Sequence, residues 1–142
     1  MTPQPQPSAD FEEVEHTADW ALRIRGRDLS ELLRNAARGM SSLLVSDLTD
    51  IPVVREERID LEAYDAESLL VNWLSELAYW AEAEGIVFCE FDLSGVTSTR
   101  LQAIVRGGPV AALQKHIKAV TYHNLAIIAT ATGLEATVVF DV

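Results

Sequence analysis

Three short segments of the chain carry groups that could bind a metal ion together. His16-Thr17-Ala18-Asp19 follows directly after a predicted strand, and Phe140-Asp141-Val142 ends the sequence with carboxylates on adjacent residues. Between them in sequence lies Lys118-Ala119-Val120-Thr121-Tyr122-His123. Carboxylate and main-chain oxygens favour Ca²⁺, Mg²⁺ or Mn²⁺ over zinc or copper. The segments therefore predict a site for a hard divalent cation, provided that the fold brings them together.

Strand alternation indicates how the two acidic segments could meet. Over residues 134–141 it puts the apolar side chains on one face and Asp141 on the more polar face. Asp19 stands where a connection meets the predicted strand 21–25. If these two strands are neighbours, both carboxylates lie at one end of the sheet. From the residues alone, an aspartate beside a turn is also a common local cap, and that reading stays open.

The same three segments, in the same order, resemble the archease family, and the resemblance extends over residues 11–142. Archeases are small proteins that assist the RtcB-type RNA ligase of tRNA splicing and RNA repair, and they carry a metal ion on two aspartates and the last residue. The resemblance therefore implies that Asp19, Asp141 and Val142 bind a divalent cation, with Ca²⁺ expected ahead of Mg²⁺ or Mn²⁺. Trp20 departs from the family pattern, because a small aliphatic residue is more usual after the aspartate.

The resemblance also suggests roles for other polar residues of these segments. Lys118 is expected to matter for activation, either by neutralising the carboxylates or by reaching a phosphate on the partner's nucleotide. His16 is a candidate fourth ligand or a donor that orients the aspartate, although a turn histidine bonded to backbone groups is the simpler reading. Thr121 and His123 are candidates for the lining of the same region.

The function that the resemblance implies is a non-catalytic activator, which promotes guanylylation of the ligase and allows repeated turnover. Two other functions stay open. One is a stand-alone metal-dependent phosphoester hydrolase, because a metal held by carboxylates can activate water; no evident general base or second metal site accompanies it, however. The other is a chaperone-like binding module with a structural metal. The chain lacks the Gly-x-x-x-x-Gly-Lys-Ser/Thr motif, so a P-loop nucleotide site is not expected.

The chain of 142 residues is acidic, with 22 acidic against 11 basic residues and a formal charge of −11. Strong direct RNA binding is not expected, because contacts with a phosphate backbone need clustered Lys and Arg. The charge either suits docking on a basic protein partner or simply keeps the protein soluble. A single cysteine, Cys89, excludes an internal disulfide, and we expect a buried, inert thiol there.

No targeting or membrane segment is evident. No apolar run approaches the ~20 residues that cross a bilayer. Residues 1–10 are rich in proline and glutamine, which predicts a disordered tail without the features of a signal peptide. A cytoplasmic location is therefore expected.

The pattern of apolar residues predicts a single α+β domain over residues 11–142. Two long helices are expected at residues 29–45 and 66–84, each capped by an aspartate, and a short third helix is expected to begin at Pro109. Helices and sheet should pack face to face, with the helices on one side of a largely antiparallel or mixed sheet. The predicted strands are residues 11–15, 21–25, 53–61, 86–93, 101–106, 125–130 and 134–141.

Trp73 and Trp80 lie seven residues apart on the second predicted helix. This spacing is two helical turns, so both rings point to the same side. We expect both to be largely buried against the sheet.

Overall fold

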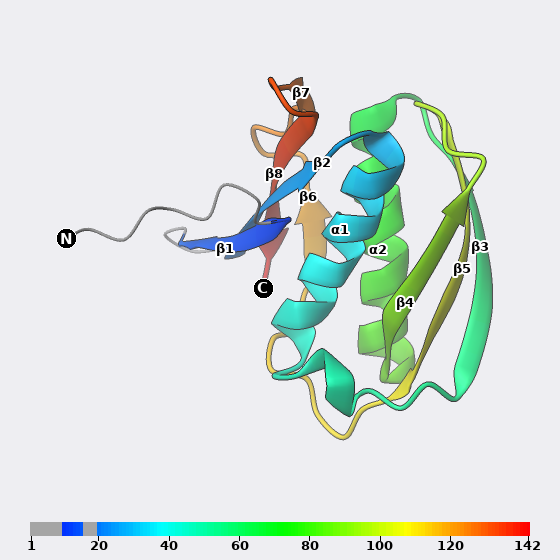
Figure 1. Cartoon of the computed structure of the whole chain (residues 1–142). Coiled ribbons are helices and arrows are strands. Elements are labelled where there is room, and N and C mark those ends of the chain that lie inside the picture. Colours follow the sequence, from blue (N-terminus) through cyan, green and yellow to red (C-terminus); the bar gives the residue numbers. More distant parts are fainter. Residues whose placement is uncertain (1–9, 16–19) are drawn as a thin grey trace.

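The computed structural model describes residues 10–15 and 20–142, which form two antiparallel sheets with two helices between them (Figure 1). Sheet A has the strand order β1-β2-β8-β6, with β7 also paired to β8, and sheet B has the order β3-β5-β4. Sheet A consists of β1 (Phe11–Glu15), β2 (Trp20–Gly26), β6 (Ala119–Thr121), β7 (Ile128–Ala129) and β8 (Leu134–Asp141). Sheet B consists of β3 (Arg55–Glu62), β4 (Ile86–Ser94) and β5 (Arg100–Pro109). The helices are α1 (Leu29–Leu44), α2 (Ala66–Glu84) and the single 3₁₀ turn η1 (Leu48–Asp50).

The helices form a middle layer that contacts both sheets. α1 packs chiefly on β2 and β4, and α2 on β4 and β6. The predicted α+β class is confirmed, but the single sheet is wrong. The reason is visible in α2, where Leu69 and Val71 are two residues apart, project to opposite sides of the helix and are both buried. A helix that is apolar on opposite sides must pack against other elements on both sides, and sheet B packs against the second side of α2.

Both long helices begin where the sequence predicts, and α2 also ends there, whereas α1 ends at Leu44, one residue earlier than expected. The side chain of Asp28 accepts a hydrogen bond from Glu31 N (2.9 Å), and that of Asp65 accepts one from Ser68 N (2.8 Å). Each bond satisfies a backbone donor that the first helical turn leaves free. α2 stops at Gly85, whose φ of 67° is a left-handed conformation that glycine adopts without strain.

The two tryptophans of α2 differ in burial. Trp73 is fully buried, with its indole N–H donating to Leu33 O at 2.9 Å, as expected for a core ring. Trp80 is only partly buried; it meets Phe88 edge to face at 5.8 Å between ring centroids, and Arg55 lies over its other side. The expected burial of both rings is thus confirmed for Trp73 and holds in part for Trp80.

The helix expected from Pro109 is absent, and residues 110–118 form an irregular connection between β5 and β6. The two glycines that precede Pro109 belong to a strand. Gly107 and Gly108 are buried within β5, where a Cβ on Gly107 would lie 2.1 Å from Val87 O. These glycines allow two backbones to pack closely, so β5 continues to Pro109.

The remaining strand predictions hold with one reduction. The strand expected at 125–130 shrinks to the two residues of β7, paired with the start of β8. The tail expected at residues 1–10 falls on residues 1–9 outside the described part, while Asp10 O accepts a hydrogen bond from Arg25 N (2.8 Å). Within the described residues, neither helix is long and apolar enough to cross a membrane.

Candidate metal centre at the end of sheet A

β8 occupies the middle of sheet A, and its last residues meet two other segments there. Phe140 pairs with Trp20 of β2 on one side and with Val120 of β6 on the other. The next residue, Asp141, pairs with Ala119. The end of β8 therefore lies between the start of β2 and the start of β6, so the fold brings the segments 118–123 and 140–142 together beside Trp20. The strand β6 itself was not predicted from the sequence.

Asp141 offers a free carboxylate at this end of the sheet. Its side chain is exposed, and among the described residues it accepts no hydrogen bond and forms no ion pair. Val142 is half-buried, and its side chain packs against the core, so its main chain is held beside that carboxylate. Carboxylate and main-chain oxygens suit a hard cation, so the donors present here fit the expected metal.

Two of the predicted residues, His16 and Asp19, lie outside the described residues. Asp19 directly precedes Trp20 in the sequence, just as Asp141 directly follows the partner of Trp20. Residues 10–15 and 20–142 alone contain no group of three or more His, Cys, Asp and Glu side chains that could hold a metal. A complete ligand set therefore needs residues beyond this part of the chain.

Lys118 is brought directly against Asp141. Its backbone N–H donates to Asp141 O at 2.7 Å, while its side chain is exposed and has no polar partner in the described part of the chain. Lys118 also lines a groove of about 400 Å³ between α2 and β6, with the half-exposed ring of Tyr79 on the opposite wall. An exposed ammonium and an exposed carboxylate thus lie on neighbouring chain segments.

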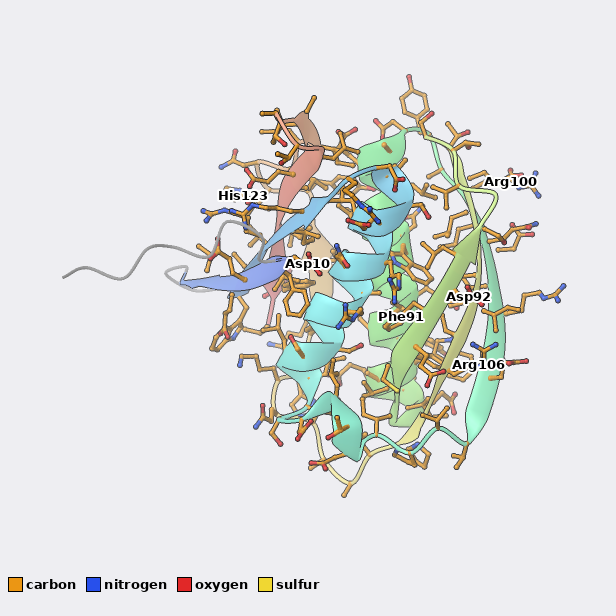
Figure 2. The ribbon with its side chains drawn as sticks, viewed as in Figure 1. Asp10, Phe91, Asp92, Arg100, Arg106 and His123 are labelled. Atoms are coloured by element: carbon orange, nitrogen blue, oxygen red, sulfur yellow. The ribbon has the colours of Figure 1, made fainter. Side chains whose placement is uncertain are left out.

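Thr121 and His123 lie farther from the carboxylate. The Thr121 hydroxyl donates to Val139 O (2.9 Å), which fastens β6 to β8, and its oxygen accepts from His123 N (3.3 Å). His123 is exposed on the outer side of sheet A (Figure 2). The bond to Val139 gives Thr121 a structural role in the sheet.

The connection 110–118 holds this end of the sheet through contacts that the sequence did not reveal. Gln114 N donates to Leu44 O at 2.8 Å, and Ile117 is buried in the core. Lys115 lies over the ring of Trp20, and His116 Nδ1 lies 3.1 Å from a carboxylate oxygen of Glu82. One signal was present in the composition: Lys115 and Lys118 are the only lysines of the chain.

Comparison with known proteins identifies the family. A sequence model described as the Archease protein family (MTH1598/TM1083) matches residues 11–142. The chain belongs to the archease family. Two relatives named "Protein archease" are similar to this chain. That of Methanosarcina barkeri is 38% identical over 140 residues, which cover 93% of this chain and 95% of the relative. That of Methanosarcina mazei is 33% identical over 146 residues, which cover 97% of this chain and 99% of the relative. None of these names states a reaction.

Two solved structures have the archease fold seen here. The solution structure of protein 1598 of Methanobacterium thermoautotrophicum shares 26% identity with a TM-score of 0.75, covering 94% of this chain and 99% of that one. A crystal structure from Thermotoga maritima, described as an archease and possible chaperone, shares 22% identity with a TM-score of 0.64 and covers both chains fully. At that identity the second likeness supports the fold alone.

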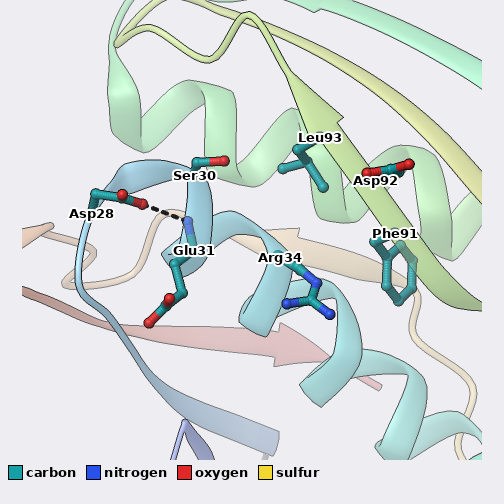
Figure 3. Close-up of a pocket in the computed structure, with 7 residues that line it drawn as sticks. All are labelled: Asp28, Ser30, Glu31, Arg34, Phe91, Asp92 and Leu93. Atoms are coloured by element: carbon teal, nitrogen blue, oxygen red, sulfur yellow. Dashed lines mark hydrogen bonds between the residues drawn. The ribbon is translucent and has the colours of Figure 1, made fainter.

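A second hollow lies at the start of α1, away from the archease segments. It measures about 350 Å³ and lies between the first turns of α1 and the strand β4 (Figure 3). Two of its three acids serve the helix: Asp28 caps α1, and a hydrogen bond from Arg27 lowers the pKa of Glu31. The third acid, Asp92, belongs to β4. Because Asp28 and Glu31 are engaged at the start of α1, we assign no chemistry to this hollow.

Cys89 is less buried than the sequence predicts. It is half-buried at a bulge of β4, between Phe88 and Glu90. Burial raises the pKa of its thiol, and the charge of Glu90 adds to this effect. Because the reactive form of cysteine is the thiolate, this residue is a poor nucleophile.

Proposed function

We propose that the protein is a metal-binding activator of an RtcB-type RNA ligase and that it performs no reaction alone. Family membership supports the general role, and one contact supports the site. The hydrogen bond from Lys118 N to Asp141 O (2.7 Å) keeps an exposed lysine beside an exposed aspartate at the end of sheet A. Activation would then rest on groups that this end of the protein presents to the ligase.

In this proposal Asp19, Asp141 and Val142 hold one divalent cation, with Ca²⁺ preferred. Trp20 pairs with Phe140, and the residue before Trp20 and the residue after Phe140 are the two aspartates. Val142 would contribute a main-chain or terminal oxygen. When bound, the cation would draw the acidic groups together and present positive charge to phosphate oxygens.

Lys118 would act beside this cation. A lysine ammonium is a compact charge on a flexible stem, well suited to contacting a phosphate group of the ligase's nucleotide. Its backbone is fixed to β8 while its side chain is exposed, so the charge can reach outward from a rigid base. Placing charge where a partner's phosphates react is a recognised way of accelerating phosphoryl and nucleotidyl transfer.

The partner surface that such a protein would meet is basic. With a formal charge of −11, the chain is repelled by RNA and attracted to positive protein surfaces. We therefore propose that it docks on the ligase and makes no strong contact with the RNA. The cytoplasm is the proposed location.

The test is multiple-turnover RNA joining by an RtcB-type ligase with GTP and a divalent metal, with and without the protein. We expect wild type to increase the number of turnovers, and Lys118→Ala and Asp141→Asn to reduce the increase while circular dichroism stays native. Arg100→Ala is the matched control, because Arg100 is exposed on sheet B (Figure 2).

Equal joining with and without the wild-type protein would refute the activator role. Phosphoester hydrolysis by the protein alone, lost in Asp141→Asn, would instead establish a hydrolase. Stimulation that survives both site variants would point to a binding module in which the metal is structural.

A further inference from the structure

Lys115 lies just before β6 in the chain and contacts β1 and β2, and the strands β2 and β6 flank the end of β8 at the candidate metal centre. Its ammonium lies 3.8 Å from the centroid of the Trp20 ring and 3.8 Å from Glu13 Oε1. Trp20 opens β2 and Glu13 belongs to β1, whereas Lys115 belongs to the connection 110–118. Three segments of different origin therefore meet at one side chain.

This side chain is held more firmly than a typical surface lysine. Only 21% of the Lys115 side chain is exposed, although lysine is among the residues most often found in solvent. An indole face attracts a cation most strongly of the aromatic rings, and a carboxylate nearby adds a second attraction. Within residues 10–15 and 20–142, the Lys115 side chain thus has two defined partners, whereas the side chain of Lys118, the other lysine of the chain, has none there.

Both residues of the contact between Lys115 and Trp20 are linked to Asp141 through the backbone. On one side, Trp20 pairs with Phe140, the residue before Asp141. On the other side, Lys115 is followed three residues later by Lys118, whose N–H donates to Asp141 O at 2.7 Å. Fixing Lys115 on the ring of Trp20 therefore holds the start of β2 and the start of β6 at set positions on either side of the end of β8.

We propose that Lys115 is a positioning residue for the metal centre and that Trp20 and Glu13 are the partners through which it acts. The inference rests on the proposed function, because it requires that a divalent cation binds where β2 and β8 end. Lys115 is not proposed as a ligand of the cation. It restrains the backbone next to the ligands, so that fewer degrees of freedom must be ordered when the cation binds.

Electrostatics alone predicts the opposite sign, which makes the inference testable. A positive charge near a cation site repels the cation, so removing the charge would tighten binding. Loss of a positioning contact weakens it. Residues that orient metal ligands typically contribute 10- to 100-fold in affinity, and we expect roughly tenfold weaker binding for Lys115→Met.

The experiment is titration calorimetry of the full chain with Ca²⁺, well below the unfolding temperature of every variant. Lys115→Met keeps the apolar stem and removes the charge, Trp20→Leu removes the ring, and the double variant tests their coupling. We expect each single variant to bind Ca²⁺ roughly tenfold more weakly and the double variant no more weakly than either, because both lose the same contact. Lys115→Arg should bind as wild type does, because arginine also stacks on an indole face.

Arg100→Met is the charge-matched control, since it removes one cation from sheet B, on the far side of the helices from sheet A (Figure 2). Its Ca²⁺ affinity should equal that of wild type. Unchanged or tighter binding by a folded Lys115→Met would overturn the positioning role while leaving the metal centre intact. Failure of the wild-type protein to bind Ca²⁺ would overturn the metal centre and the positioning role together.

Discussion

Replacing Trp73 by alanine should be among the most damaging single changes to stability. The ring is fully buried, it meets Phe91 edge to face at 6.1 Å, and its N–H donates to Leu33 O at 2.9 Å. Removing it leaves a cavity between α1, α2 and β4, and substitutions of this type cost about 3–5 kcal/mol. Domains of ordinary stability have about 5–15 kcal/mol in total, so the loss is a large fraction.

Trp80→Ala provides the internal comparison. The same atoms are removed from the same helix, but this ring is only partly buried, and Arg55 lies over its face 5.0 Å from the centroid. Less apolar surface is withdrawn from water when Trp80 folds into place, and we expect a loss of about 2 kcal/mol. Tyr79→Ala, at a side chain that is 59% exposed, should change stability by no more than about 0.5 kcal/mol.

The assay is equilibrium unfolding in urea, followed by circular dichroism. With a slope of about 1–3 kcal/mol per molar urea, the loss expected for Trp73→Ala lowers the midpoint by about 1 M or more. The slope itself should stay constant, because the unfolded surface changes little. If Trp73→Ala destabilised the protein no more than Trp80→Ala does, the assignment of Trp73 to the centre of the core would be wrong.

Three further predictions concern other parts of the molecule. Gly107→Ala should cost about 1–3 kcal/mol in thermal unfolding, because the added Cβ meets Val87 O at 2.1 Å and the strands must shift. The hydrogen bond from Ser68 lowers the pKa of Asp65 in the folded state. This cap therefore stabilises the folded protein above the unfolded pKa of about 3.9, and the stabilisation is lost as the pH falls through the lower folded value. The difference in unfolding free energy between wild type and Asp65→Ala should accordingly shrink in acid. Ca²⁺ at about a hundred times its dissociation constant should stabilise wild type by about 2.7 kcal/mol in a thermal shift assay and leave Asp141→Asn unaffected.

The helices could be predicted from sequence because their ends are determined locally. Asp28 and Asp65 each bond a backbone N–H three residues later, and Gly85 stops α2 by adopting a positive φ. These are interactions between near neighbours, so the residues that make them can be read from spacing. The same holds for the hairpins β1–β2 and β4–β5, whose strands are adjacent in the chain.

The remaining features depend on contacts between distant residues. Gly107 resembles a turn residue in sequence, yet the reason for glycine is the approach of Val87 from another strand. The division into two sheets follows from burial on opposite sides of α2, which a count of apolar residues does not assign to particular strands. Local patterns carry no information on such partners, and the expected helix after Pro109 failed for that reason.

The surroundings of Asp141 were predictable in part, whereas the contacts that support them were not. Alternation in the last strand correctly leaves Asp141 exposed while Phe140 is buried. The neighbouring positions of β2 and β8, on which the site depends, also agree with the prediction. The contact of Lys115 with Trp20 was missed, because nothing in the spacing of either residue indicates that a ring in β2 meets a side chain from the connection 110–118.

The place of β8 in sheet A has a consequence for how a new molecule is completed. β8 is the last strand of the chain but lies between β2 and β6, and Gly26 near the start of the chain pairs with Leu134 near its end. Pairing over such a separation forms slowly. During synthesis, α2 and all of sheet B leave the ribosome before β8 does, so one edge of β2 is still unpaired at that stage. An unpaired strand edge can pair with other chains and lead to aggregation. Because β8 follows every other described strand in the sequence, its pairing with β2 and β6 can form only after all of those strands have been made.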